Sequence, residues 1–153
     1  MELFLVQHGE AKSKTEDPDR PLTDRGVETV RRMAAWALQA GITVAQIRHS
    51  GKRRAEQTAE IFAEHLNPAS GVIATEGLGP NDDVRAVADK LTSEMGPLML
   101  VGHLPFLSRL AGLLLTGEPE AVVVRFRNAG VVGLRREAEP WSLDWAVPPE
   151  LLM

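Results

Sequence analysis

Two histidines stand at the ends of apolar segments of this chain, each next to a glycine. His8 lies in "LFLVQHGEA" and His103 lies in "PLMLVGHLP". An imidazole in such a position can act as a nucleophile, a proton carrier or a metal ligand. A single histidine there would be an ordinary residue at the edge of a core, whereas two at corresponding positions favour a functional site. No third protein ligand supports a metal site.

A basic cluster, "HSGKRRAEQTA", follows another short apolar segment. It places Ser50 and three cationic side chains around the expected start of a helix. The free N–H groups and the positive dipole end of a helix start attract phosphate. An arginine fork adds donors that match phosphate oxygens. A basic run is normally a solvated face, and Lys52 and Arg53 need no other explanation.

Two further segments carry weaker signals. Arg20 lies in the loop after the first strand, between Pro18 and Pro21, and the prolines stiffen the backbone around it. Taken alone, this segment is equally explained as a turn before a helix. The late segment "RFRNAGV" favours a strand turn over a contribution from Asn128 to a pocket.

The elements that must position these residues alternate between strand and helix. Apolar runs predict strands, and helical spacing of apolar residues predicts helices. The expected strands are 3–7, 44–50, 71–78, 97–103 and two or three within 121–147, and the expected helices are 23–41, 52–66, 82–95 and 105–117. This order predicts an α/β fold, a three-layer sandwich with a mostly parallel central sheet flanked by helices. Ligands bind beyond the carboxyl ends of such strands.

Composition limits the classes of function. The 153 residues fit a single domain spanning 1–153. A net charge of -4 argues against nucleic acid as the main partner. There are no cysteines, which excludes disulfides and thiolate metal sites. No stretch approaches the ~20 apolar residues that cross a bilayer, and the first residues do not form a signal peptide, so we expect no membrane association and a cytoplasmic location.

Four motifs occur in the order seen in the histidine phosphatase (phosphoglycerate mutase-like) superfamily: "QHGEA", "RPLTDRG", "SGKRRAEQTA" and "VGHLP". Within that superfamily, the short chain, the "RPLT" and the "HLP" resemble the SixA-type phosphohistidine phosphatases. The resemblance covers essentially the whole chain. It implies a phosphoglycerate mutase-like fold and a phosphatase that needs no metal or organic cofactor.

The resemblance also implies roles for individual residues. His8 would be the nucleophile that takes the phosphoryl group, Arg54 the phosphate-binding arginine, and His103 the second histidine of the pocket. Arg20 would correspond to the extra arginine of the short subgroup. We also expect Gly9 to let phosphate come close, because a Cβ there would intrude.

The first motif departs from the family pattern. The family has Arg-His-Gly, and this chain has Gln7-His8-Gly9. Neutral hydrogen bonds from a glutamine are about half as strong as charge-assisted ones. We expect a loss on the order of 1 to 3 kcal/mol in phosphate or transition-state binding, and therefore a working but slower phosphatase. The alternative is a non-catalytic module that only binds phosphorylated groups.

The leaving-group acid and the substrate stay open at this level. Glu76 and Asp83 follow the third strand, where larger relatives carry an acid, but Asp83 is equally explained as a helix cap. Imidazole leaves more easily than an alkoxide, and no insertion covers the crevice. Both points favour phosphohistidine in a protein, with a small phosphomonoester as the alternative, and fold analogy cannot choose between them.

Overall fold

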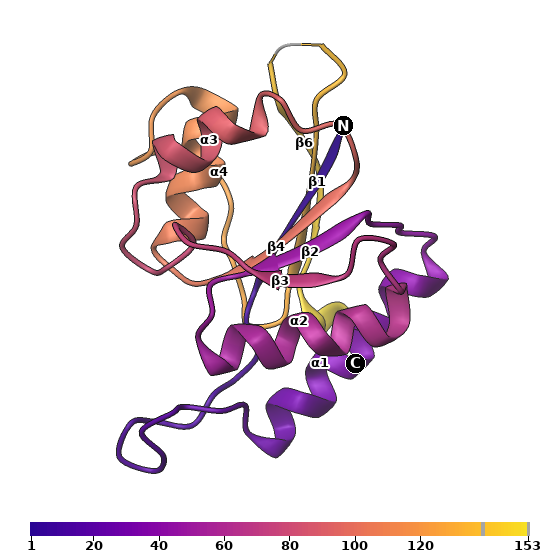
Figure 1. Ribbon diagram of the computed structural model, residues 1–153, viewed down its shortest axis with the longest axis vertical. Coiled ribbons are helices and arrows are strands. Elements are labelled where there is room, and N and C mark those ends of the chain that lie inside the picture. The colour runs from indigo at the N-terminus through magenta and orange to yellow at the C-terminus, as the bar shows by residue number, and fades with distance from the viewer. Residues whose placement is uncertain (139, 153) are drawn as a thin grey trace.

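One mixed sheet forms the centre of the molecule (Figure 1). The computed structural model describes residues 1–138 and 140–152, and within these ranges six strands form a sheet in the order β3-β2-β4-β1-β5-β6. The strands are β1 (Glu2–Gln7), β2 (Gln46–His49), β3 (Val72–Ala74), β4 (Leu98–Gly102), β5 (Val131–Arg135) and β6 (Ser142–Val147). The first four run parallel, and β5 and β6 are antiparallel to their neighbours. The predicted α/β sandwich is confirmed.

Helices cover both faces of the sheet, as Figure 1 shows. The pair α1 (Asp24–Gln39) and α2 (Arg53–Leu66) lies on one face, and the pair α3 (Val84–Leu91) and α4 (Phe106–Thr116) lies on the other, with a short 3-10 turn, η1 (Pro149–Leu152), near the end. Alternate side chains of β1 point to the two faces. Phe4 and Val6 join the core under α1 and α2, whereas Leu3 and Leu5 join the core under α3 and α4.

Side chains near the helix ends explain where several elements begin and stop. The Thr23 hydroxyl accepts the N–H of Gly26 at the start of α1, as an N-cap should. Helix α3 is shorter than predicted. It begins after its cap, Asp83, and just beyond its end the hydroxyls of Thr92 and Ser93 donate to main-chain carbonyls of its last turn. Such local bonds compete with the helix.

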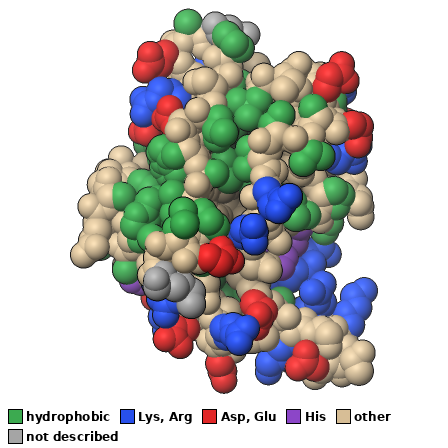
Figure 2. Space-filling view, turned by 180° about the vertical axis from the view of Figure 1, so that it is seen from behind, with side chains coloured by type: hydrophobic (Ala, Val, Ile, Leu, Met, Phe, Trp, Pro, Cys, Tyr) green, Lys and Arg blue, Asp and Glu red, His purple; other side chains and the backbone are tan. Residues whose placement is uncertain are grey.

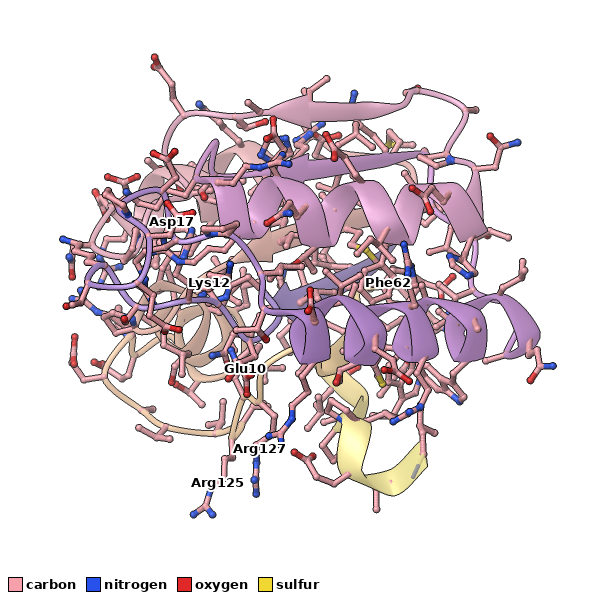
Figure 3. All side chains as sticks on the ribbon, turned by 90° about the horizontal axis from the view of Figure 1, so that it is seen from below. Glu10, Lys12, Asp17, Phe62, Arg125 and Arg127 are labelled. Carbon is pink, nitrogen blue, oxygen red and sulfur yellow. The ribbon has the colours of Figure 1, made fainter. Side chains whose placement is uncertain are left out.

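The valine-rich segment 121–130 pairs with no neighbouring strand, so two strands follow α4 among the described residues, which agrees with the two or three expected. Val124 and Phe126 are buried in the core. Arg125 and Arg127 alternate with them and project away from the ribbon into solvent (Figure 3). The alternation of a strand is therefore present without its hydrogen-bonded partner.

Aromatic rings pack on both sides of β6 and the hairpin that precedes it. Trp145 contacts Phe4 and Trp36, with ring centroids 5.9 and 5.7 Å apart. Both tryptophans pack against the core under α1 and α2. Trp141 packs against the other core, and the Arg136 guanidinium lies 4.8 Å from its ring centroid.

Strand register brings the ends of β1, β2 and β4 to one level. Gln7 lies opposite Gly102, and His49 lies opposite Val101. The residues that follow these strands therefore leave the sheet side by side. Among the described residues, no helix is long and apolar enough to cross a membrane.

Candidate active site

His8 and His103 come together at the carboxyl edge of the sheet. Their ring centroids are 5.0 Å apart, with the ring planes inclined at 54°. The main chain explains this, since the N–H of His8 donates to the Gly102 carbonyl at 3.0 Å and continues the ladder between β1 and β4. The expectation that two strand ends deliver their imidazoles to one place is confirmed.

One ring nitrogen of His8 is held by the main chain. Its Nδ1 lies 2.7 Å from the Gly9 carbonyl oxygen. A carbonyl can only accept, so Nδ1 carries the hydrogen and Nε2 keeps a lone pair. Burial, with a smaller contribution from the charges of Arg54 and Arg20 and against the Gly9 hydrogen bond, lowers the pKa of His8 to about 4. The ring is therefore neutral near pH 7, as attack on phosphorus requires.

His103 is more deeply enclosed, with 1% of its surface exposed. Its Nε2 lies 2.6 Å from the Ser50 hydroxyl oxygen, while its Nδ1 is buried without a hydrogen-bond partner. Burial, with smaller contributions from His8 and Arg54, lowers the pKa of His103 to about 3. This second imidazole is also neutral, so both rings face the site without a fixed charge.

Arg20 and Arg54 supply the positive charge. Both line a hollow of about 880 Å³, together with Lys14, Asp17, Pro18, Asp19, Pro21, Gly51, Lys52, Arg53, Glu56 and Pro80. His8 and His103 do not line this hollow, but both arginines lower the pKa of both histidines. The four side chains therefore form one electrostatic cluster. Figure 2 shows a histidine among Lys and Arg side chains at the lower right.

The two guanidinium groups are held close despite their like charge. Arg20 has a left-handed backbone, with φ of 48°, and its Nε donates to the Lys12 carbonyl at 3.0 Å. Arg54 has a buried Nε without a partner. Burial and the charge of Arg20 lower the pKa of Arg54. Such a pair attracts an anion, and its forked donors match phosphate.

Packing against α1 requires a glycine at position 9. A Cβ at Gly9 would lie 2.7 Å from Cγ2 of Val30 and 3.3 Å from the Gly26 carbonyl. The glycine therefore allows α1 to pack against the loop after β1. Its N–H donates to Thr58 Oγ1 at 3.0 Å and is not free for phosphate. The structure thus shows a packing requirement for Gly9, and the close approach of phosphate stays a prediction.

Thr58 and Asn128, neither of which the sequence predicts in this position, hold the segment around His8 in place. Thr58 accepts from Gly9 and donates to the Arg54 carbonyl at 2.8 Å, so it joins β1 to the first turn of α2. Asn128 Nδ2 donates to the His8 carbonyl at 3.0 Å, and the N–H of Ala129 donates to the Gln7 carbonyl at 2.8 Å. The threonine in "RAEQT" was the only signal for Thr58. Asn128 had been favoured as a turn residue.

Gln7 does not line the hollow that holds Arg20 and Arg54. It lines a second hollow of about 690 Å³, with Glu10, Arg25, Glu28, Thr29, Arg32, Phe126, Arg127, Asn128, Pro149 and Glu150. Its side-chain oxygen is buried without a hydrogen-bond partner. Within the described residues, the glutamine thus places an acceptor without a hydrogen-bond partner directly before His8.

Neither expected carboxylate lines the hollow that holds Arg20 and Arg54. Asp83 caps α3 by accepting from the N–H of Arg85 at 2.9 Å, and it lines a separate hollow of about 260 Å³ with Arg109. Glu76 is exposed. Within residues 1–138 and 140–152, no group of three His, Asp or Glu side chains is arranged to hold a metal ion.

Comparison with known proteins places this geometry in a family. The sequence model of the histidine phosphatase superfamily (branch 1) matches residues 3–79. Phosphohistidine phosphatase SixA from Escherichia coli strain K12 is 32% identical over 154 residues, which cover 97% of this chain and 94% of that protein.

Solved structures agree. The structure of the protein histidine phosphatase SixA complexed with tungstate matches with a TM-score of 0.89 at 27% identity, over 100% of both chains. The α-ribazole phosphatase from Shigella flexneri shares the fold, with a TM-score of 0.81 at 16% identity over 97% of each chain. Because the family model matches residues 3–79 and the Escherichia coli relative is 32% identical over 97% of this chain, the chain belongs to the histidine phosphatase superfamily.

Proposed function

We propose that this protein is a phosphatase that works through a phosphohistidine on His8, and that its substrate is phosphohistidine in another protein. The observation that carries the proposal is the hydrogen bond from His8 Nδ1 to the Gly9 carbonyl. It leaves the Nε2 lone pair free in a neutral ring, beside the charges of Arg54 and Arg20. Membership of the family supports a phosphatase.

In the first step, His8 Nε2 attacks phosphorus and the bond from phosphorus to the substrate nitrogen breaks. The guanidinium groups of Arg20 and Arg54 stabilise charge on the oxygens in transfer, which is most of what this reaction asks of a protein. In the second step, water attacks phosphorus and the bond to Nε2 breaks. Both hydrogens of the water stay with the released phosphate, and His8 returns to its neutral form.

The choice of phosphohistidine rests on the leaving group. A phosphohistidine with a proton on its second ring nitrogen leaves as neutral imidazole, so no acid is required. Neither Glu76 nor Asp83 lines the hollow of Arg54, which supports a reaction of this kind. The named relative, phosphohistidine phosphatase SixA, supports the same substrate.

A second candidate function is hydrolysis of a small phosphomonoester. The hollow of about 880 Å³ is large enough for such a molecule, and its lining carries five cationic side chains, Lys14, Arg20, Lys52, Arg53 and Arg54. A metabolite phosphatase would need an acid for its alkoxide leaving group, and this requirement makes it the weaker proposal.

The test is to trap the phosphoenzyme. The protein is incubated with a histidine-containing protein phosphorylated by labelled phosphoramidate, or with an aryl phosphate, and then denatured in alkali, in which the P–N bond survives. We expect label on the wild type and none on His8→Ala. Faster release from the phosphoprotein supports our proposal, and faster release from the aryl phosphate supports the phosphomonoesterase. Binding of phosphate without any label would identify a non-catalytic module.

A further inference from the structure

The hydroxyl oxygen of Ser50 contacts a ring nitrogen of His103 and the main-chain N–H of Lys52. Ser50 follows β2 at the level where His8 follows β1 and His103 follows β4. Its oxygen lies 2.6 Å from His103 Nε2 and 3.3 Å from the main-chain nitrogen of Lys52. Because an N–H can only donate, Lys52 already uses one lone pair of the Ser50 oxygen.

The contact with His103 has two possible directions, and the other ring nitrogen decides between them. Nδ1 of His103 is buried and has no partner within the described residues. If Ser50 donated to Nε2, the neutral ring would carry its hydrogen on Nδ1, and a buried N–H would be orphaned. Orphaned buried N–H groups are rarer than unpaired acceptors. The hydrogen therefore belongs on Nε2, and His103 donates to Ser50.

This assignment leaves the Ser50 hydroxyl with one free donor. Both lone pairs of its oxygen are used, by the N–H groups of His103 and Lys52, and its own hydrogen must point in a third direction. Among the described residues, the Ser50 hydroxyl makes no hydrogen bond besides these two, so its hydrogen has no acceptor. Ser50 is only half-buried as a residue.

We propose that Ser50 is a phosphate-binding residue, whose hydroxyl donates to an equatorial oxygen of the phosphoryl group that His8 receives. The inference rests on the proposed function, because it assigns a further donor to that reaction. Arg20 and Arg54 supply positive charge, and Ser50 supplies a neutral hydrogen-bond donor from the end of β2, at the same edge of the sheet. His103 acts on this donor by holding its oxygen in one orientation.

The first experiment reads the proton on His103 directly. In ¹⁵N-labelled protein, two-bond ¹H–¹⁵N correlations of the ring distinguish a protonated from a bare nitrogen. We expect a protonated Nε2 and a bare Nδ1 in the protein without substrate. A protonated Nδ1 would overturn the proposal, because the Ser50 hydrogen would then be used by His103. This readout does not depend on any catalytic activity.

The second experiment measures binding of inorganic phosphate, and then kcat/KM with an aryl phosphate. A hydrogen bond to a charged group contributes about 1.5 to 3 kcal/mol, so Ser50→Ala should weaken both by about 10- to 100-fold. Ser50→Thr, which keeps the hydroxyl, should stay within about threefold of the wild type. Ser93→Ala, at the end of α3, is the matched control.

The remaining outcomes distinguish failure of the role proposed for Ser50 from failure of the proposed function. Equal phosphate binding by Ser50→Ala and the wild type would refute the proposal. A loss in Ser50→Ala that comes with a changed His103 tautomer would also refute it, because Ser50 would then act only through that ring. If the wild type forms no phosphoenzyme, the proposed function fails, while the phosphate titration still tests Ser50.

Discussion

The ionisation of His8 depends on its neighbours as well as on its burial. Burial lowers the pKa of His8 to about 4, and the charges of Arg54 and Arg20 act in the same direction. We expect the His8 ring to titrate near that value in an NMR titration of the protein alone. In Arg54→Gln the pKa of His8 should rise, because one positive charge is removed. A wild-type ring that titrates near 6.5 would contradict this description of the site.

The glutamine at position 7 offers a direct test of how much charge the site lacks. Gln7→Arg should raise kcat/KM with an aryl phosphate by about 10-fold, the effect of about 1.4 kcal/mol in the transition state. The new guanidinium would replace a side-chain oxygen that is buried without a partner. Gln7→Met, which has no charge and no donor, is the control. A tenfold fall in Gln7→Arg would mean that the glutamine has a role of its own.

At the scale of elements, α1 and the loop after β1 are closely packed at Gly9, where a larger side chain does not fit. Gly9→Ala would place a methyl group 2.7 Å from Val30 Cγ2, and overpacking of this kind costs about 1–3 kcal/mol. We expect a lower free energy of unfolding in urea. The double variant Gly9→Ala/Val30→Ala should lose less than the sum of the two single variants. Strict additivity would show that the two residues do not press on each other.

Parallel strands explain which parts of the site the sequence could reveal. His8 and His103 were predictable because each follows an apolar strand, and neighbouring strands of a parallel sheet end at one edge. Asn128 reaches the His8 carbonyl across 120 positions of the chain, and only the folded turn at Ala129 brings it there. The packing role of Gly9 could not be predicted, because its neighbour Val30 belongs to a helix whose approach no local pattern encodes.

At the scale of the whole molecule, the buried histidines link stability to pH. Unfolded histidine titrates near 6.5, whereas burial lowers the pKa of His8 to about 4 and of His103 to about 3. Between about pH 6.5 and 4, the unfolded chain binds more protons, so the free energy of unfolding should fall as the pH falls. Urea unfolding at a series of pH values measures this slope. His103→Gln should make it shallower, and an unchanged slope would argue against a neutral buried ring.

Membership of the family determines the fold of this chain but not the identity of its substrate. The fold and the order of the motifs follow from the chain's place among the histidine phosphatases. The identity of the substrate depends on the rim of the hollow, where exposed side chains such as Lys14 and Asp19 lie in a loop. Loops of this kind vary most freely, so the substrate is the part that sequence patterns predict least.

The aromatic packing described above has a practical consequence for spectroscopy. The chain has three tryptophans and no tyrosine, so its ultraviolet emission comes from indole alone. Trp36 and Trp145 report on one layer of helices, and Trp141, beside Arg136, reports on the other. Phenylalanine variants at these positions would therefore let each layer be watched separately as the protein melts. Such traces would tell whether the two halves come apart together or in sequence.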